Sequence, residues 1–220
     1  ASQETRNAVY DGPLNKLCLK LSDNDKFRRM WGIPVEPTPE EKNADEEMDD
    51  AGDEATTAGT RMFERMEDVE LVLRFFAYRK IGDFKAGLNK ISEFLDRFLV
   101  AGNKFPDTGL AEYRTMFVTT VDFLWDVLEA DAFTVLDPSR RRPAKIVYDP
   151  LMFVANSPDV VLHREKLIAK KEVLRAELKA MYEKNQTLFS GRRTNFKDTL
   201  DRNRCVGEAF AAAIAKTKNT

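Results

Sequence analysis

The sequence predicts an all-α fold, an irregular multi-helix bundle around a central apolar helix, interrupted by a long disordered acidic insertion. Apolar residues recur at steps of three and four in several segments, which is the spacing of amphipathic helices. No two neighbouring segments alternate apolar and polar residues as paired strands do. Of the 220 residues, 43% are hydrophobic, so one core can bury about 70% of the surface that the unfolded chain exposes. The fold therefore needs no disulfide or metal ion to be stable.

The central helix is expected over residues 65–79. Its apolar face is too wide for one neighbouring helix to cover. Acidic residues crowd its first turns and basic residues its end, the order that the helix dipole favours. The residues of the apolar face are Met66, Val69, Val72, Leu73, Phe75 and Phe76.

The N-terminal part is expected to hold three short helices. The first covers residues 2–10, and Asp11-Gly12-Pro13 ends it, with Pro13 placed as the first residue of the second. Residues 22–24 interrupt the helical pattern and supply the cap of the third helix. We therefore divide the chain into N-terminal helices (1–32), a flexible insertion (33–60) and a helical bundle (61–220).

The insertion differs from the rest of the chain in composition. Residues 36–54 hold ten Asp or Glu and one Lys, a formal charge of −9; because the whole chain carries −2, the remainder carries +7. Three prolines and this acidic run cannot bury enough apolar surface to offset the entropy of ordering, so we expect a mobile segment. It is either a solvated linker or an acidic strand that competes with nucleic acid for the basic surface.

Several further helical stretches are expected after the central helix. Asp83 is expected to cap one that ends near Gly102, and Pro106 to start a longer one. Pro150 is expected to open a short helix, and Pro158 another, with one helix running over residues 162–182. A terminal helix is expected after a cap at Thr194, and its apolar residues are Phe196, Leu200, Val206, Phe210 and Ile214.

The chain offers few signs of catalytic chemistry. It has no glycine-rich phosphate loop and no Gly-x-Ser-x-Gly turn. Cys18 and Cys205 lie far apart in the sequence and have no paired spacing, so we expect neither a disulfide nor a metal site, and we expect a reducing, cytoplasmic setting. We also expect no cofactor. His163 has no visible partner, which favours a solvent-facing or capping role over a catalytic one. We expect no catalytic residue in this chain, no signal peptide and no membrane helix.

Basic residues are the remaining functional signal. Guanidinium groups in a loop beside a helix N-terminus suit DNA phosphates, although such clusters also occur as solvated faces. The candidate nucleic-acid-binding residues are Arg140, Arg141, Arg142, Arg192, Arg193, Lys197, Arg202 and Arg204.

Three stretches of the chain carry a family resemblance. Residues 4–15 read Glu-Thr-Arg-Asn-Ala-Val-Tyr-Asp-Gly-Pro-Leu-Asn, and residues 27–32 read Phe-Arg-Arg-Met-Trp-Gly. Residues 65–77 read Arg-Met-Glu-Asp-Val-Glu-Leu-Val-Leu-Arg-Phe-Phe-Ala. Together they resemble the helical half of the GmrSD-type restriction effectors, and the basic loop before residues 148–152 and the Arg-x-Arg of the terminal helix match that family more loosely. The resemblance covers nearly the whole chain and implies a role in phage defence.

The resemblance also implies what this chain lacks. In that family, nucleotide-dependent DNA cleavage resides in an Asp-Gly-Gln-Gln-Arg motif of a ParB/sulfiredoxin-like N-terminal half, and here Asp11-Gly12 continues into Pro13-Leu14. Because the chain begins at Ala1, without a methionine and inside a helical pattern, we expect it to be a fragment or the second half of a split gene. The expected partners are that nucleotidase half, DNA and a second copy of the chain.

Two alternatives to a DNA-contacting module stay open. In the first, the chain is a structural or oligomerisation scaffold, and exposed Tyr10, Trp31 or Phe133 would favour it. In the second it is a cryptic enzyme, which would need a cleft that gathers a base and a nucleophile.

Overall fold

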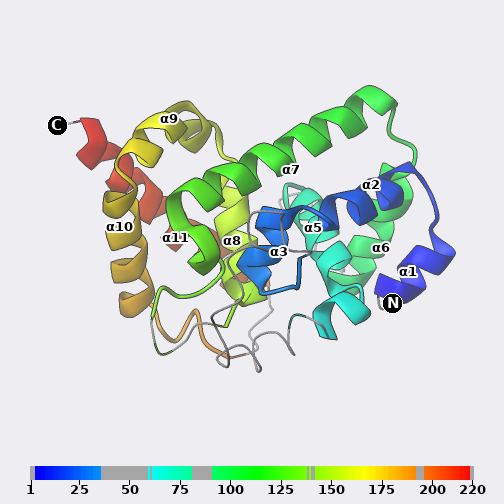
Figure 1. Cartoon of the computed structure of the whole chain (residues 1–220), viewed down its shortest axis with the longest axis horizontal. Helices are drawn as coiled ribbons and strands as arrows, with labels where there is room; N and C mark the ends of the chain where they lie inside the picture. Colours follow the sequence, from blue (N-terminus) through cyan, green and yellow to red (C-terminus); the bar gives the residue numbers. More distant parts are fainter. Residues whose placement is uncertain are drawn as a thin grey trace, which may run out of the picture.

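The computed structural model describes residues 3–35, 59, 61–80, 91–137, 139, 142–191 and 196–218, and every regular element among them is a helix (Figure 1). The all-α prediction is therefore confirmed. None of the helices in these ranges is long and apolar enough to cross a membrane. The labelled elements are α1 (Gln3–Val9), α2 (Pro13–Ser22), α3 (Asp25–Trp31), α5 (Glu67–Tyr78), α6 (Ile91–Gly102), α7 (Asp107–Leu128), η4 (Glu129–Asp131), α8 (Lys145–Ala155), α9 (Pro158–Ala169), α10 (Lys171–Lys184) and α11 (Phe196–Lys218).

Helix α5 is the central helix that the sequence predicts. Ten of its twelve residues are buried, and it packs against α1, α2, α6, α7 and α8. Met66 was assigned to its apolar face, and this is wrong: the residue lies before the helix in a left-handed conformation and is 37% exposed. Asp68 and Arg74 are buried instead, so α5 is covered on all sides and not only along its apolar stripe.

Helix α7 crosses much of the molecule in Figure 1, between the N-terminal helices on one side and α9 and α10 on the other. It contacts α2, α3 and α5 at one end and α8, α9 and α10 at the other. An aromatic cluster packs beside it: the ring of Phe27 lies edge-on to Phe117 at 5.4 Å and to Tyr148 at 6.2 Å between ring centroids. One continuous core therefore serves both the N-terminal and the C-terminal helices.

The turn between α1 and α2 is held by a side chain from the end of α6. Asn103 Oδ1 accepts hydrogen bonds from the backbone N–H groups of Leu14 (3.0 Å) and Asn15 (3.2 Å), and its Nδ2 donates to the Tyr10 carbonyl (3.0 Å). Asn103 thus caps the free amides of α2 from outside that helix. A Cβ atom on Gly12 would lie 2.4 Å from Asn103 Cγ, so this close approach requires glycine.

Several predicted helix starts are confirmed. Pro13 and Pro158 begin α2 and α9, Asp107 begins α7 after Pro106, and Asn24 caps α3 by accepting from the Phe27 N–H at 2.9 Å. The described residues do not include the predicted caps Asp83 and Thr194 or residues 36–58 of the predicted insertion.

Three predictions in the C-terminal half are wrong. Helix α8 begins at Lys145, with Pro150 inside it, because the buried Val147 and Tyr148 hold the preceding turn in place. The helix expected over residues 162–182 is broken at Lys170 (φ −124°, ψ 42°), and the break lets α9 and α10 each pack on both α7 and α11. Leu200 is 44% exposed, because the buried face of α11 runs through Thr199 instead.

Candidate nucleic-acid interface and its supporting network

The basic loop between η4 and α8 is closed at its base. The Ala144 N–H donates to the Phe133 carbonyl at 2.9 Å, which joins the two ends of the loop. The Phe133 ring is fully buried and lies edge-on to the ring of Tyr148, with 4.9 Å between centroids. The loop is therefore anchored in the aromatic core, and Val135 and Leu136 also pack against that core.

The start of α8 is fixed by two polar side chains. Tyr148 donates from its hydroxyl to the Leu71 carbonyl of α5 at 2.9 Å, and burial raises the pKa of this phenol well above its ordinary value. Lys145 Nζ lies 3.0 Å from a carboxylate oxygen of Glu67 and 3.5 Å from one of Glu70. The basic loop thus ends on a residue that is tied to α5.

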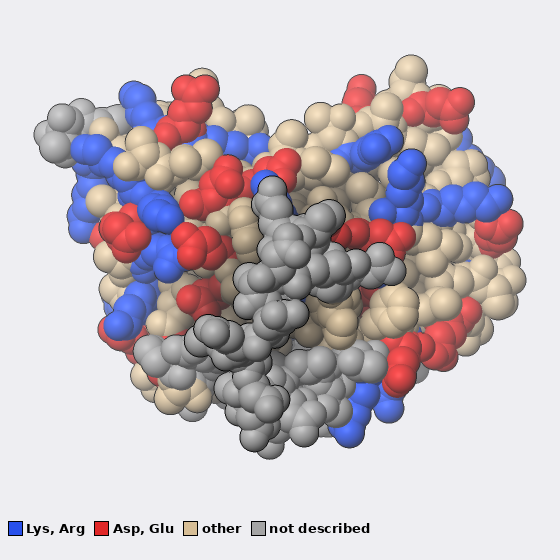
Figure 2. Space-filling view, in the orientation of Figure 1, with Lys and Arg blue, Asp and Glu red and all other residues tan. Residues whose placement is uncertain are grey.

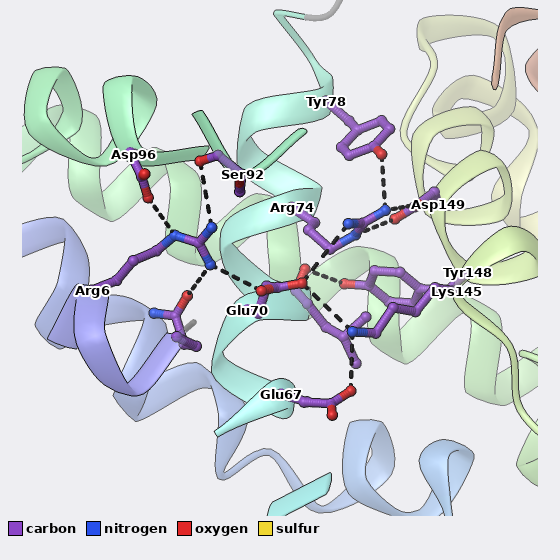
Figure 3. A network of polar contacts seen from close by, with 12 residues as sticks. Arg6, Glu67, Glu70, Arg74, Tyr78, Ser92, Asp96, Lys145, Tyr148 and Asp149 are labelled. Atoms are coloured by element: carbon purple, nitrogen blue, oxygen red, sulfur yellow. Dashed lines mark hydrogen bonds and ion pairs between the residues drawn. The ribbon is translucent and has the colours of Figure 1, made fainter. Parts of the chain in front are cut away.

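Glu70 is the shared carboxylate of a partly buried charge network (Figure 3). Besides Lys145, it accepts from Arg6 Nη1 of α1 at 2.9 Å and lies 3.9 Å from Arg74 Nη1. Burial alone would raise the pKa of the Glu70 carboxyl, but Lys145, Arg74 and Arg6 outweigh it and hold the pKa below its ordinary value. Charges from α1, α5 and α8 therefore meet at one acid.

The two arginines of this network are themselves buried. Arg6 is 1% exposed and donates from Nε to Asp96 of α6 at 2.7 Å, as well as to Glu70. Arg74 makes a two-bond contact with Asp149 of α8, one bond of 3.1 Å from Nε and one from Nη2. Burial opposes the charge of Arg74, but Asp149 outweighs it, and the pKa of the guanidinium rises above its ordinary value. Such pairs fix the geometry of the helices that they join.

A second segment lies beside the basic loop: the turn formed by residues 185–191, after α10. Arg202 of α11 donates from Nε to the Leu188 carbonyl at 2.9 Å and so holds this turn against α11. The rings of Tyr182 and Phe189 pack edge-to-face at 5.0 Å between centroids. Gly191 follows with φ +72°, a left-handed conformation that favours glycine.

Loop and turn border the same cavity. Val135, Asp137 and Ser139 form one wall, around a volume of about 210 Å³. The other wall consists of Tyr182, Glu183, Gln186 and Phe189. A second cavity of about 330 Å³ shares Asp137 with the first and continues between η4, the loop and α10. In Figure 1 the two segments lie together below α10, and Figure 2 shows basic and acidic side chains interspersed on this end of the molecule.

The structure gives the predicted DNA-binding residues different environments. Arg142 and Lys197 are exposed. Arg204 is also exposed, but lies 3.7 Å from Asp201 and 3.2 Å from Glu208 on its own helix. Arg202 is 3% exposed and serves the turn. The other four, Arg140, Arg141, Arg192 and Arg193, lie outside the described residues.

Sequence reasoning did not identify the charge network or the Asn103 cap. The available signal was a charged residue inside the most apolar stretch: Arg74 stands between Leu73 and Phe75, where a cation needs a buried partner. No comparable signal marked Arg6, because α1 has only seven residues and little apolar pattern.

The other candidate residues have structural environments. His163 Nδ1 lies 2.8 Å from the Asp159 carbonyl one turn earlier in α9, which is compatible with the predicted helix-associated role. Cys18 and Cys205 are free and buried, and burial raises the pKa of both thiols. The described residues contain no group of His, Cys, Asp and Glu that could hold a metal ion.

The described residues form an irregular all-α bundle whose basic loop is tied at its base by one backbone hydrogen bond. Comparisons with protein-family models, with curated proteins and with solved structures found no match.

Proposed function

We propose that this chain is a non-catalytic helical module of a GmrSD-like restriction or phage-defence protein. In this role it supports a ParB/sulfiredoxin-like nucleotidase half and contacts DNA through its basic loops. The observation that carries the proposal is the position of the motif residues on which the resemblance rests. Arg6, Gly12, Phe27 and Arg74 all act in packing or in the charge network, as a supporting module requires.

The supporting role follows from how α1 is attached. Arg6 ties α1 to α5 through Glu70 and to α6 through Asp96, although α1 itself is too short to be stable alone. A domain joined to the start of α1 would thus be held in a fixed orientation to the bundle.

The DNA-contacting role is supported by two exposed cations, Arg142 in the basic loop and Lys197 after the turn. The loop and the turn are continuous in sequence with Arg140–Arg142 and with Arg192–Arg193. The loop is tied between Phe133 and Ala144 and the turn is held at Leu188, so these anchor points need no ordering when phosphate binds. Guanidinium groups in this setting suit a phosphate backbone.

Anisotropy titrations with a short duplex at 50 and 200 mM salt test the DNA-contacting role. A phosphate-driven site weakens steeply with salt, and the double variant Arg142→Glu, Lys197→Glu should bind more weakly, with a salt slope smaller by about two units. The matched control is Arg114→Glu, an exposed arginine of α7. No binding by the unmodified chain at low salt, or equal loss in the control, would refute the DNA contact.

The scaffold alternative has its own observation. Trp31 and Phe133, whose exposure would have favoured it, are buried, whereas Leu162 of α9 is 79% exposed and Leu200 of α11 is 44% exposed. Helices α9 and α11 are in contact, so Leu162 and Leu200 lie on two helices that are neighbours in the fold. If they form a self-association surface, the mass measured by light scattering should rise with concentration, and Leu162→Lys should abolish that rise.

A further inference from the structure

Helix α1 is attached to the bundle without burying an apolar side chain. Its two buried residues are Gln3 and Arg6, which are both polar. In the part of the chain that the structure describes, no residue of α1 belongs to the hydrophobic core cluster or packs against it, and Val9 is 63% exposed. Most helices of a folded protein are held in place by the apolar face that they bury. Helix α1 therefore depends on another kind of attachment.

The guanidinium group of Arg6 supplies this attachment by reaching from α1 into a socket of oxygen atoms on α5 and α6 (Figure 3). The socket consists of the carboxylates of Glu70 and Asp96, which accept from it at 2.9 and 2.7 Å, and the Ser92 carbonyl, which accepts at 3.4 Å. Gln3 of α1 also accepts from Nη1 at 3.3 Å. Among the described residues, both ion pairs between α1 and the bundle use Arg6. Such charge-assisted hydrogen bonds are about twice as strong as neutral ones.

The chain that follows α1 is fixed independently of Arg6. Asn103 donates to the Tyr10 carbonyl and accepts from the first amides of α2, and the Tyr10 side chain packs against the core. In Figure 1, α1 lies at one edge of the molecule. Residues 3–9 can therefore leave the bundle while α2 stays in place. Because α1 has seven residues, too few for a helix that is stable alone, it would unfold on leaving.

We propose that α1 is an ionic latch, which opens and closes as a unit while the rest of the bundle stays folded and which the ion pairs of Arg6 hold closed. Opening returns the Arg6 charge to water. It strands neither acid, because Glu70 keeps Lys145 and Arg74 nearby and Asp96 is already 22% exposed. Opening also exposes almost no apolar surface, so it should respond to charge and hardly at all to urea.

The latch has a consequence for the proposed function. A nucleotidase half joined to α1 would be held in one orientation while the latch is closed and released from the bundle when it opens. This consequence rests on the proposed function, whereas the opening itself is a property of the present chain. The measurements below use the chain without a partner or DNA, so they can fail while the proposed function stands, and the reverse.

Hydrogen exchange of the full chain, followed by NMR at several urea concentrations below the unfolding transition, tests the latch. The α1 amides include the Tyr10 N–H, which donates to the Arg6 carbonyl at 2.8 Å. We expect them to be protected, but at least about a hundredfold less than those of α5, and their opening free energy should fall much less with urea. A urea slope shared with α5 would mean that α1 opens only when the bundle unfolds, which overturns the proposal. Absence of protection in α1 overturns it too, because no closed state would then be populated.

Variants of α1 test the role of Arg6. Arg6→Gln should reduce the protection of the α1 amides on the order of a hundredfold, and Arg6→Lys by less, because lysine keeps the charge but loses the planar fork. Val9→Gln is the matched control, since it introduces the same side chain at an exposed position of the same helix and should leave α1 protected. In Arg6→Gln the α5 amides should stay protected, with an unchanged urea slope.

Three results from these variants would contradict the latch. If α1 keeps its protection in Arg6→Gln, the ion pairs do not hold it closed. If Val9→Gln causes an equal loss, the effect belongs to the helix and not to its charge. If α5 loses all protection in Arg6→Gln, Arg6 holds the whole bundle together and α1 is not a separate unit.

Discussion

At the scale of single residues, Glu70 receives cations from three directions: Arg6 from α1, Arg74 from its own helix and Lys145 from α8. The carboxylate is 20% exposed, so solvent weakens these pairs only in part. Its loss would remove one of the two charged partners, Glu70 and Asp96, that the described part of the chain gives the almost fully buried Arg6.

The variant Glu70→Gln should lower the free energy of unfolding by about 2 kcal/mol at pH 7, because removing one partner leaves buried charge uncompensated. The folded pKa of Glu70 lies below the ordinary value of 4.5, so its contribution is present above about pH 4.5 and is lost as the pH falls through the folded value. Urea unfolding of both proteins at pH 7 and pH 3 checks this: the difference should shrink in acid. A difference in unfolding free energy that is the same at both pH values would show that the shape of the Glu70 side chain, and not its charge, accounts for the loss of stability.

Asp68 is the opposite case. It is 2% exposed, and burial raises its pKa above the ordinary value of 3.8, although the Val69 N–H and Arg28 oppose the shift. The charged carboxylate of Asp68 therefore lowers the free energy of unfolding. This loss is absent below pH 3.8, the ordinary pKa, and is complete once the pH exceeds the raised pKa of the folded state. Asp68→Asn keeps an oxygen for the Val69 N–H and should raise stability by about 1 kcal/mol at neutral pH, measured as the thermal midpoint. At pH 3 the gain should disappear; a gain at both pH values would contradict this explanation.

At the scale of elements, the α1–α2 turn depends on the space between Gly12 and Asn103. Gly12→Ala should displace the Asn103 side chain, remove its bonds to the first amides of α2 and cost about 1–3 kcal/mol. Gly207→Ala in α11 is the matched control, since nothing lies within 4 Å of the added Cβ. There the same change should stabilise the helix by up to about 1 kcal/mol. Chemical denaturation of both variants is the measurement, and a loss of similar size at both positions would refute the close-approach argument.

Helix positions were predictable wherever apolar spacing and caps agreed. Asn24, Pro13 and Pro158 marked true boundaries because their effect is local. The start of α8 and the break at Lys170 were not predictable, because tertiary packing decided them: buried Tyr148 extends the helix ahead of Pro150.

The candidate interface was predictable only in part. Basic residues are visible in any sequence, but nothing local distinguishes Arg142, which is exposed, from Arg202, which is buried beneath a turn. The network around Arg6 and Asp96 joins residues far apart in sequence, and no spacing rule relates them. Partner choice for a buried charge depends on the assembled helices.

At the scale of the whole molecule, α7 contacts helices at both ends, and one core cluster includes residues from α2 through α11. Unfolding in urea should therefore be a single transition. In a Trp125→Phe background, Trp31 in the aromatic cluster reports on the N-terminal side by fluorescence, while circular dichroism follows all helices. The two midpoints should coincide within error, and a fluorescence transition that precedes the loss of helix would show that the two ends unfold separately.

The hydrogen bond between the Phe133 carbonyl and the Ala144 N–H has an evolutionary consequence. Because the chain enters and leaves the loop at one tied point, residues between Leu136 and Ala144, which both pack against the core, can be substituted, inserted or deleted with little effect on the helices on either side. Related proteins could diversify what this end of the bundle recognises while inheriting the same scaffold.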